Sequence, residues 1–341
     1  DVMAGAEQSH YHRHGYNQGF GTDEYLKDTN SVLNEETGYY NWQHNPSKRS
    51  EQEWATHNSL VSYFSRLNYN LLDRYLITAT FRADGSSRFT KGKKWGYFPS
   101  AAFAWKINHE GFLKDVKWLD DLKLRVGWGK TGQQNGIDDF YYAPLYVVGN
   151  SYAQYPFGND YHQTVRPNKY NDQLTWEKTT TWNAGIDFAA LNNRFSFNLD
   201  GYYRKTTDLL STVDVPAGTT FGDNQLKNVG SLKNYGLELA FDVKPIVTKD
   251  FTWDITYNVG WNHNEITSLD AGAQDWVWTG DKISRGNNTK ILKNKVGEAV
   301  NSFFVYQQVY DENGKPIEGL YVDRNADGQI NDDDRYFYKN P

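Results

Sequence analysis

"LKLRVGWGK", residues 122–130, alternates apolar and polar or small side chains from Leu122 to Gly129. The apolar members, which share one side of an extended chain, are Leu122, Leu124, Val126 and Trp128. The intervening Lys, Arg and Gly residues lie on the other side. Because successive side chains of a β-strand point to opposite faces, the pattern predicts a strand with one apolar and one polar face.

The same two-residue period recurs along most of the chain and predicts seven further strands. They are expected over residues 59–69, 75–82, 97–107, 178–188, 195–204, 235–242 and 251–262. The last of them, "FTWDITYNVGWN", alternates without a break. Eight two-faced segments in one chain indicate an all-β protein.

The connections between these strands alternate in length. Those over residues 71–74, 108–121, 191–194 and 244–250 are short or moderate. Those over residues 83–95, 131–175, 206–228 and from 263 onward are expected to be long and polar. Short turns on one side and long loops on the other are typical of an antiparallel transmembrane β-barrel with long extracellular loops. A soluble β-sandwich or propeller also alternates, but its connections are short at both ends.

Composition agrees with a barrel and excludes several other classes. The 341 residues include 16% aromatics, with 12 Trp and 25 Tyr, which are enriched at membrane–water boundaries and at sugar-binding surfaces. No apolar run reaches the length of a transmembrane helix, and the absence of Cys excludes disulfides and cysteine metal sites. A net charge of -6 argues against a nucleic-acid partner. The first residues, "DVMAGAEQSH", do not read as a signal peptide, so we expect an internal piece or a processed chain.

One loop-like stretch, "LYVDRNADGQINDDDR" (residues 320–335), carries oxygen ligands at the spacing of a calcium loop. The predicted ligands are Asp323, Asn325, Asp327, Gln329, Asn331 and Asp334. Gly328 stands where such a loop bends sharply, whereas Asp334 replaces the usual Glu at the last position. The alternative is a polar Asp-Gly turn without metal. We expect a structural Ca²⁺ in an extracellular loop.

The remaining chemical groups give no catalytic signature. The carboxylates that fall on predicted strands all lie on polar faces, where a wet lumen explains them, and they are Glu177, Asp187, Glu238 and Asp254. The histidines of "HYHRH", which are His10, His12 and His14, are expected in an exposed loop or rim rather than at a metal. No nucleophile elbow, phosphate loop or zinc signature occurs, so we expect no enzyme.

Aromatic residues divide into two groups. Those on predicted strands, such as Trp105, Trp182 and Trp253, are expected to face lipid or to form a boundary belt. Those in long connections are equally compatible with loop packing and with stacking on a ligand or partner, and they are Tyr141, Tyr142, Tyr146, Tyr152, Tyr155, Trp276 and Trp278.

Most of the chain from about residue 58 resembles the SusC/RagA-type TonB-dependent transporters of Bacteroidetes outer membranes. The resemblance rests on six stretches in the family's order: "RYLITATFRADGSSRF" (74–89), "WGYFPS" (95–100), "LKLRVGWGKTGQQ" (122–134), "YYRKTTDLL" (202–210), "NVGSLKNYGLEL" (228–239) and "YDENGKPIEGLYVDRNADGQINDDDR" (310–335). Residues 1–57 match less distinctly.

This resemblance implies a barrel of 22 strands in the outer membrane, filled by a plug domain and driven by the TonB complex. It also implies a SusD-like surface lipoprotein as partner and a glycan or peptide as cargo. Residues 1–341 are expected to be part of the barrel domain, without plug or TonB box, from the C-terminal half of a longer chain. Two alternatives are a non-transporting carbohydrate-binding β-protein of the cell surface, and a siderophore receptor, which lacks the "ADGSSRF" and "NADGQIN" segments.

Overall fold

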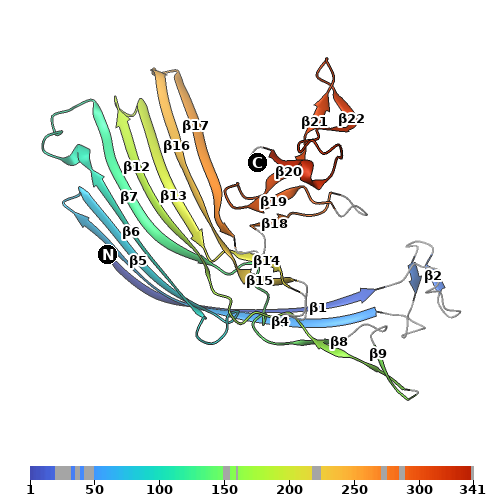
Figure 1. The fold of residues 1–341 in the computed structure, drawn as a ribbon. Coiled ribbons are helices and arrows are strands. Elements are labelled where there is room, and N and C mark those ends of the chain that lie inside the picture. Colours follow the sequence, from blue (N-terminus) through green and yellow to red (C-terminus); the bar gives the residue numbers. More distant parts are fainter. Residues whose placement is uncertain are drawn as a thin grey trace.

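The structure is a curved antiparallel sheet of nine strands with smaller sheets gathered at one end (Figure 1). It is a computed structural model, and it describes residues 1–19, 32–34, 39–41, 50–148, 154–158, 160–216, 224–269, 275–283 and 289–338. Within these residues no helix has the length and apolar character needed to cross a membrane. The only helical turns described are two short 3-10 segments, η4 (Ile107–His109) and η5 (Asp332–Asp334).

The nine strands follow one another across the sheet in chain order, and each pairs with the next. They are β1 (Val2–Gly19), β4 (Ser50–Leu71), β5 (Tyr75–Ser86), β6 (Trp95–Lys106), β7 (Leu119–Gln133), β12 (Glu177–Ala190), β13 (Phe195–Thr207), β16 (Gly230–Val247) and β17 (Thr252–Leu269). Strands β1 and β17 form the two edges of the described sheet. This is the meander expected of an up-and-down barrel wall.

Each of the eight predicted segments forms a strand of this sheet, and most strands extend further toward the long connections. One predicted connection differs. Residues 83–86 continue β5, because Gly85 still pairs with Trp95 and Ala83 with Tyr97. Only residues 87–94 remain to join β5 to β6, so the long loop expected over 83–95 is a short one.

Strand β1 was not predicted. It pairs with β4 at 18 positions, from Val2 opposite Leu67 to Gly19 opposite Ser50. The sequence of β1 is polar on both faces beyond Ala6, so the period of two carries no apolar signal there. The backbone ladder to β4, rather than an apolar face, defines this strand.

The sheet has one apolar and one polar face, and the strand registers align them across the whole wall. One row on the apolar face comprises Ile77, Phe103, Val126, Ala184, Gly201, Leu237 and Trp261. The neighbouring row on the polar face comprises Thr78, Ala102, Gly127, Asn183, Tyr202, Gly236 and Asn262. The two-faced strands of the sequence therefore form one two-faced sheet.

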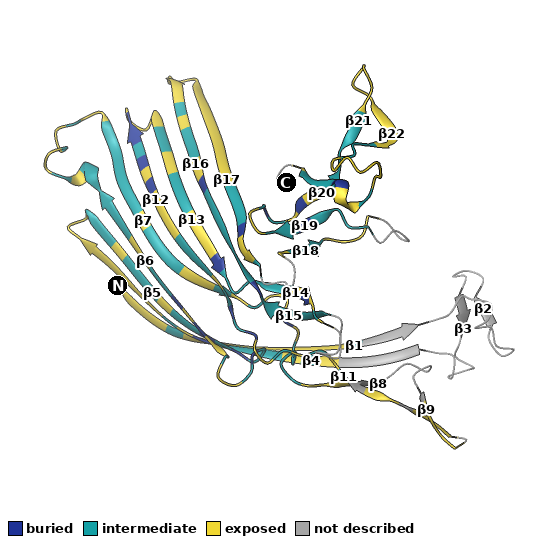
Figure 2. Ribbon diagram, in the orientation of Figure 1, coloured by how far each residue is buried: buried dark blue, intermediate teal, exposed yellow. Residues whose placement is uncertain are grey.

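Large side chains on the apolar face are exposed (Figure 2). Trp182 on β12 is 45% exposed and Tyr203 on β13 is 40% exposed, although both strands have a paired neighbour on each side. A contiguous apolar surface of this extent is rare on a monomeric soluble protein, where it costs free energy in water. Contact with lipid removes that cost.

The long connections pack together on the polar side of the sheet, at one end. Their small apolar core contains Phe89, Phe98, Ile137, Leu174 and Trp176. Phe98 projects from β6 on the polar face, opposite Arg82, and the ring of Trp176 contacts it edge-on at 5.5 Å. The indole N–H of Trp176 donates to the carbonyl of Lys94. The loops therefore lean over the polar face and leave the apolar face bare.

A charged contact fixes the loop that follows β7 to this end of the sheet. The carboxylate of Asp139 accepts hydrogen bonds from Arg88 Nε at 2.9 Å and from the hydroxyl of Thr56 at 2.5 Å. Burial alone raises the pKa of Asp139, but these hydrogen bonds outweigh it and hold the pKa below its usual value. The anchor is therefore present at neutral pH and is lost only as the pH falls through that lowered pKa.

Short strands form the remainder of the loop region. They are β2 (Val32–Asn34), β3 (Tyr39–Asn41), β8 (Tyr146–Val148), β9 (Gln154–Phe157), β10 (Asp160–Gln163), β11 (Val165–Pro167), β14 (Leu210–Asp214) and β15 (Asn224–Asn228). A four-stranded sheet follows β17 and contains β18 (Trp276–Thr279), β19 (Leu292–Lys295), β20 (Ser302–Tyr306) and β23 (Arg335–Tyr338). The hairpin of β21 (Gln308–Tyr310) and β22 (Pro316–Tyr321) extends from it (Figure 1).

The short turn between β12 and β13 holds three successive left-handed residues. Leu191, Asn192 and Asn193 have φ of 60°, 59° and 56°. Asn tolerates this region, whereas the Cβ of Leu is crowded there, at a cost of about 1–2 kcal/mol. We expect Leu191→Gly to raise the free energy of unfolding by about 0.5–1 kcal/mol, the gain being reduced by the entropy of the unfolded Gly chain. Equilibrium unfolding by urea from lipid or detergent measures it.

The matched control is Leu199→Gly, in the middle of β13, where the backbone is extended and Gly brings no relief. This control is expected to lose stability. If both substitutions lowered stability equally, the left-handed turn would not be strained by Leu191.

Candidate functional site

The polar face carries a charged network near its centre, built on Arg125 of β7. The guanidinium donates through Nε and Nη2 to the carboxylate of Asp187 on β12, at 2.7–3.0 Å. It also donates to Asp200 of β13 at 2.9 Å. Lys123 Nζ lies 2.6 Å from Asp187, and the amide of Asn198 donates to the same carboxylate at 2.8 Å. Three strands are thus bridged by one compensated cluster.

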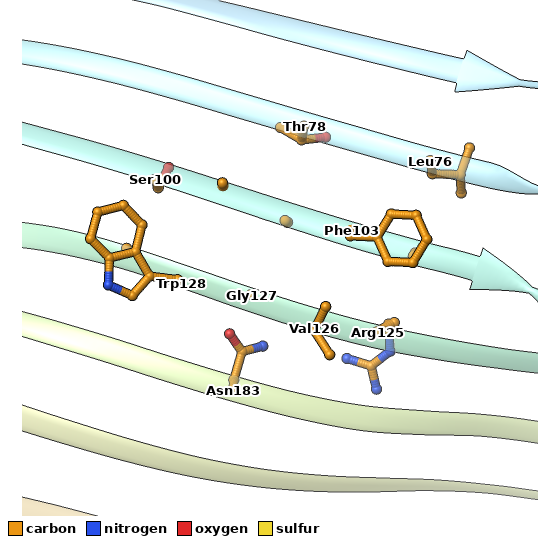
Figure 3. Close-up of a pocket in the computed structure, with 13 residues that line it drawn as sticks. Leu76, Thr78, Ser100, Phe103, Arg125, Val126, Gly127, Trp128 and Asn183 are labelled. Atoms are coloured by element: carbon orange, nitrogen blue, oxygen red, sulfur yellow. The ribbon is translucent and has the colours of Figure 1, made fainter.

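Residues without bulky side chains surround this network and keep the polar face flat. A methyl group added at Gly127 would collide with the side-chain oxygen of Asn183, and one at Gly185 with Asp200 and Arg125. Only glycine lets these polar side chains lie along the wall. Beside them is a shallow recess of about 520 Å³, bordered by Arg125 and Asn183 on either side of Gly127 (Figure 3).

The predicted strand carboxylates do not converge on one catalytic point. Asp187 is neutralised by the network above, while Glu177 accepts from Gln133 and from the backbone N–H of Leu210. Glu238 stands opposite Asp200 and Gly260 in the register, and Asp254 lies far along β17 from both. Their arrangement suits a hydrated wall that contacts solutes through hydrogen bonds and charge.

His10, His12 and His14 were expected in an exposed loop or rim, and they lie on strand β1. All three are exposed, and the register places His12 opposite His57 of β4. His10 Nδ1 lies 2.7 Å from the hydroxyl of Ser59. Over the described part of the chain, no group of three or more His, Cys, Asp or Glu side chains is placed to hold a metal ion.

The predicted cation loop follows β22 and is tightly folded. Gly328 has φ of 81°, which permits the sharp bend expected at that position. Asp323 accepts hydrogen bonds from the N–H groups of Gly328 at 2.7 Å and Asp327 at 3.3 Å, and Asp327 accepts from Gln329 at 2.8 Å. Asn325 accepts from the N–H of Asp327 at 3.1 Å. Backbone N–H groups therefore already neutralise part of the negative charge.

Asp334 closes the loop from the inside. It is fully buried, and its two carboxylate oxygens accept from the backbone N–H groups of Asn331 and Arg324, each at 2.8 Å. The hydrogen bond from Asn331 is the main cause that holds the pKa of Asp334 below its ordinary value. The side chain of Asn331 accepts from Asp333, which caps η5. The predicted first and last ligands thus lie at the two ends of one closed turn.

Several loop aromatics are occupied by packing. The hydroxyl of Tyr141 accepts from the N–H of Leu226 in the loop core. Trp276 and Trp278 surround the ammonium of Lys293, which lies 3.7 Å from the first ring centre and 5.3 Å from the second. Burial among these rings lowers the pKa of Lys293. The sequence did not single out Lys293, since a lone Lys on a short strand carries no motif.

Other loop aromatics stay available for contacts. Tyr146 is 68% exposed and Tyr155 is 57% exposed, while Tyr142 is half-buried. Tyr152 lies outside the described residues.

Comparison with known proteins places this wall in a family. The profile of the family described as "TonB dependent receptor-like, beta-barrel" matches residues 4–332. The chain belongs to the TonB-dependent receptor β-barrel family. It is accordingly a segment of an outer-membrane β-barrel, and the family is one of receptors rather than of enzymes.

Named relatives narrow the likeness to the SusC/RagA type. The chain is 57% identical over its whole length to the TonB-dependent receptor SusC of Bacteroides thetaiotaomicron, of which it covers 33%. It is 34% identical over 91% of its length to the TonB-dependent receptor P26 of Formosa agariphila, of which it covers 32%. The chain therefore spans about a third of the length of these curated relatives.

The fold is shared with a solved transporter. The structure of the RagAB peptide importer in its open-open state superposes with a TM-score of 0.72, covering 99% of this chain and 35% of that one, at 23% sequence identity. At this sequence identity the likeness shows the fold of this chain and nothing more. That fold agrees with the predicted barrel wall.

Proposed function

We propose that this chain forms part of the wall and the loops of an outer-membrane TonB-dependent importer whose cargo is an oligosaccharide or a peptide. One observation carries the proposal: a two-faced sheet, bare on its apolar face and polar on the other, occurs in a chain 57% identical to SusC throughout. In this role the polar face lines the lumen. The network around Arg125 and the flat Gly127 wall contact a passing polar solute.

The importer works with two partners. A SusD-like surface lipoprotein meets the long loops, and the TonB complex supplies the energy through parts of the protein outside these 341 residues. The name of the relative that is 57% identical, the TonB-dependent receptor SusC, supports the TonB complex as a partner. Affinity purification of the tagged protein from outer membranes is expected to recover a lipoprotein in an equimolar amount with the tagged protein. Recovery of the protein alone would remove the lipoprotein from the proposal.

Uptake by cells tests transport itself. A strain lacking the gene is expected to lose uptake of one class in a panel of labelled oligosaccharides and oligopeptides, and the wild-type gene is expected to restore it. The class that is lost names the cargo. If the uptake of every labelled compound were unchanged and the purified protein bound sugars, the alternative of a non-transporting carbohydrate-binding protein would be favoured. The exposed rings of Tyr146 and Tyr155 are the observation that supports this alternative, because such rings can stack on sugars.

We further propose that the loop from Asp323 to Asp334 binds a structural Ca²⁺. Three of the predicted ligands, Asp323, Asp327 and Asp334, are carboxylates within one closed turn of twelve residues, and the bend at Gly328 is the one a calcium loop requires. Such a loop in an extracellular setting needs only about millimolar affinity. Calcium would then hold the loop between β22 and β23 rather than switch it.

Titration of chelator-treated protein with Ca²⁺ measures this site. We expect Asp323→Ala to weaken calcium binding at least tenfold, because it removes the first ligand of the loop. Glu318→Ala, on the neighbouring β22 and equally acidic, is the matched control and is expected to bind as the wild type does. Equal calcium binding by wild type and Asp323→Ala would contradict the assignment of this loop as a calcium site.

A further inference from the structure

The apolar face ends in a row of aromatic residues on four adjacent strands. Trp128, Trp182, Tyr203 and Tyr235 stand side by side in the registers of β7, β12, β13 and β16. Ring centres of Trp182 and Tyr203 are 5.8 Å apart, and those of Tyr203 and Tyr235 are 6.5 Å apart. Aromatic side chains in such a row lie at the boundary between hydrocarbon and water. The row therefore marks the level of the lipid headgroups on the long-loop side.

Lysines follow directly beyond this boundary, on the same face. Two residues further along each strand, the register aligns Lys130, Thr180, Lys205 and Lys233 in that order. Lysines that stand at headgroup level attract anionic lipids. The row thus places positive charge beyond the aromatic residues on the same face.

Two of the neighbouring lysines are already compensated. Lys233 Nζ lies 2.8 Å from Glu265, and Lys178 Nζ lies 3.1 Å from Asp208. Among the residues that the structure describes, Lys130 and Lys205 form no salt bridge, and both are exposed. They are two strands apart, which separates their backbones by roughly 10 Å. The two free charges therefore flank the hydroxyl of Thr180.

An apolar groove lies on the other side of the aromatic row. It has a volume of about 700 Å³, and Trp182, Tyr203, Val126 and Phe103 border it. Its floor is Ala184 and Gly201, which are partners in the register and carry at most a methyl group. A groove of this kind accepts a hydrocarbon chain, because it is apolar and opens on the face that meets lipid.

We propose that the groove and the two lysines together bind one phosphate-bearing lipid of the leaflet on the long-loop side. Its acyl chain lies over Ala184 and Gly201, and its phosphate lies between Lys130 and Lys205, within reach of the Thr180 hydroxyl. Both halves of the lipid meet a matching surface on adjacent strands. The inference goes beyond import and depends only on the membrane location of the wall.

Native mass spectrometry of the protein in neutral detergent tests the site, with phosphatidylglycerol and phosphatidylcholine of identical chains as probes. Wild type is expected to retain phosphatidylglycerol more tightly. Lys130→Gln with Lys205→Gln is expected to weaken this binding about thirtyfold, from the typical contribution of a lysine near an anionic headgroup. Ala184→Leu, which fills the groove without a charge change, is expected to weaken both lipids.

The matched control replaces two exposed lysines away from the apolar face, Lys91→Gln with Lys315→Gln, and is expected to leave lipid binding unchanged. Equal retention of the two lipids by wild type would overturn the headgroup assignment. Unaltered phosphatidylglycerol binding by the Lys130 and Lys205 double variant would overturn the site. Displacement of the lipid by millimolar inorganic phosphate alone would show that the groove takes no part.

Discussion

Ile186→Arg is expected to lower the free energy of unfolding by about 2–4 kcal/mol, the typical cost of a basic residue on the lipid face of a barrel near its middle. Ile186 lies on the apolar face of β12, between Leu124 and Leu199 in the register, and is 38% exposed. In a soluble sheet the same exposed position would accept Arg at almost no cost. The substitution therefore separates lipid from water as the environment of this face.

The control is Asn258→Arg on β17, an exposed residue of the polar face. It is expected to change stability by less than about 0.5 kcal/mol, because its side chain meets water in either state. Unfolding by urea from lipid bilayers measures both variants. A loss at Asn258 that matched or exceeded the loss at Ile186 would reverse the assignment of the two faces.

Arg125→Met is expected to cost about 2–3 kcal/mol, because it leaves the buried carboxylate of Asp187 with only Lys123 and the amide of Asn198, and leaves Asp200 without its cation. The guanidinium is 30% exposed, so water screens part of the charge and keeps the cost below that of a dry ion pair. The same urea titration measures the change.

Two further variants show where that cost arises. Arg125→Lys retains the charge but loses the forked geometry that reaches both Asp187 and Asp200, so an intermediate loss is expected. Arg125→Met with Asp187→Asn removes the more buried of the two carboxylates that lose Arg125 and is expected to recover a substantial part of the loss. If the double variant were as unstable as the sum of its parts, packing rather than charge compensation would hold these strands together.

Alternation in the sequence was sufficient to predict eight of the nine strands and their two faces, because residues such as those of 122–129 obey a strict period of two. It was insufficient in two places. Strand β1 has no apolar face beyond Ala6, and Ala83 to Ser86 continue β5 with small and polar residues that read as a turn. In both places backbone pairing with a neighbouring strand decides the structure, and pairing partners leave no local signal.

The charged network illustrates the same limit for the candidate site. Asp187 was recognised as a polar-face carboxylate, but its partner Arg125 is 62 residues away, across a long connection. Only the register of β7 with β12 places Lys123 opposite Asp187. The cation loop was readable because its oxygen atoms come from one contiguous stretch with a fixed spacing. Its predicted ligands are gathered in one turn, and calcium binding itself stays a prediction.

The length of the β1 and β4 ribbon has a consequence for what meets the cell surface first. A membrane-spanning strand needs about 10 residues, whereas β4 has 22 and begins at the long-loop end (Figure 1). About half of β4 therefore stands clear of the bilayer, which at the usual tilt raises its tip roughly 25–30 Å above the hydrocarbon. This ribbon is then the tallest part of the described wall. An antibody or a bacteriophage approaching the cell would reach this ribbon, with the histidines of β1, before the rest of the nine-stranded sheet.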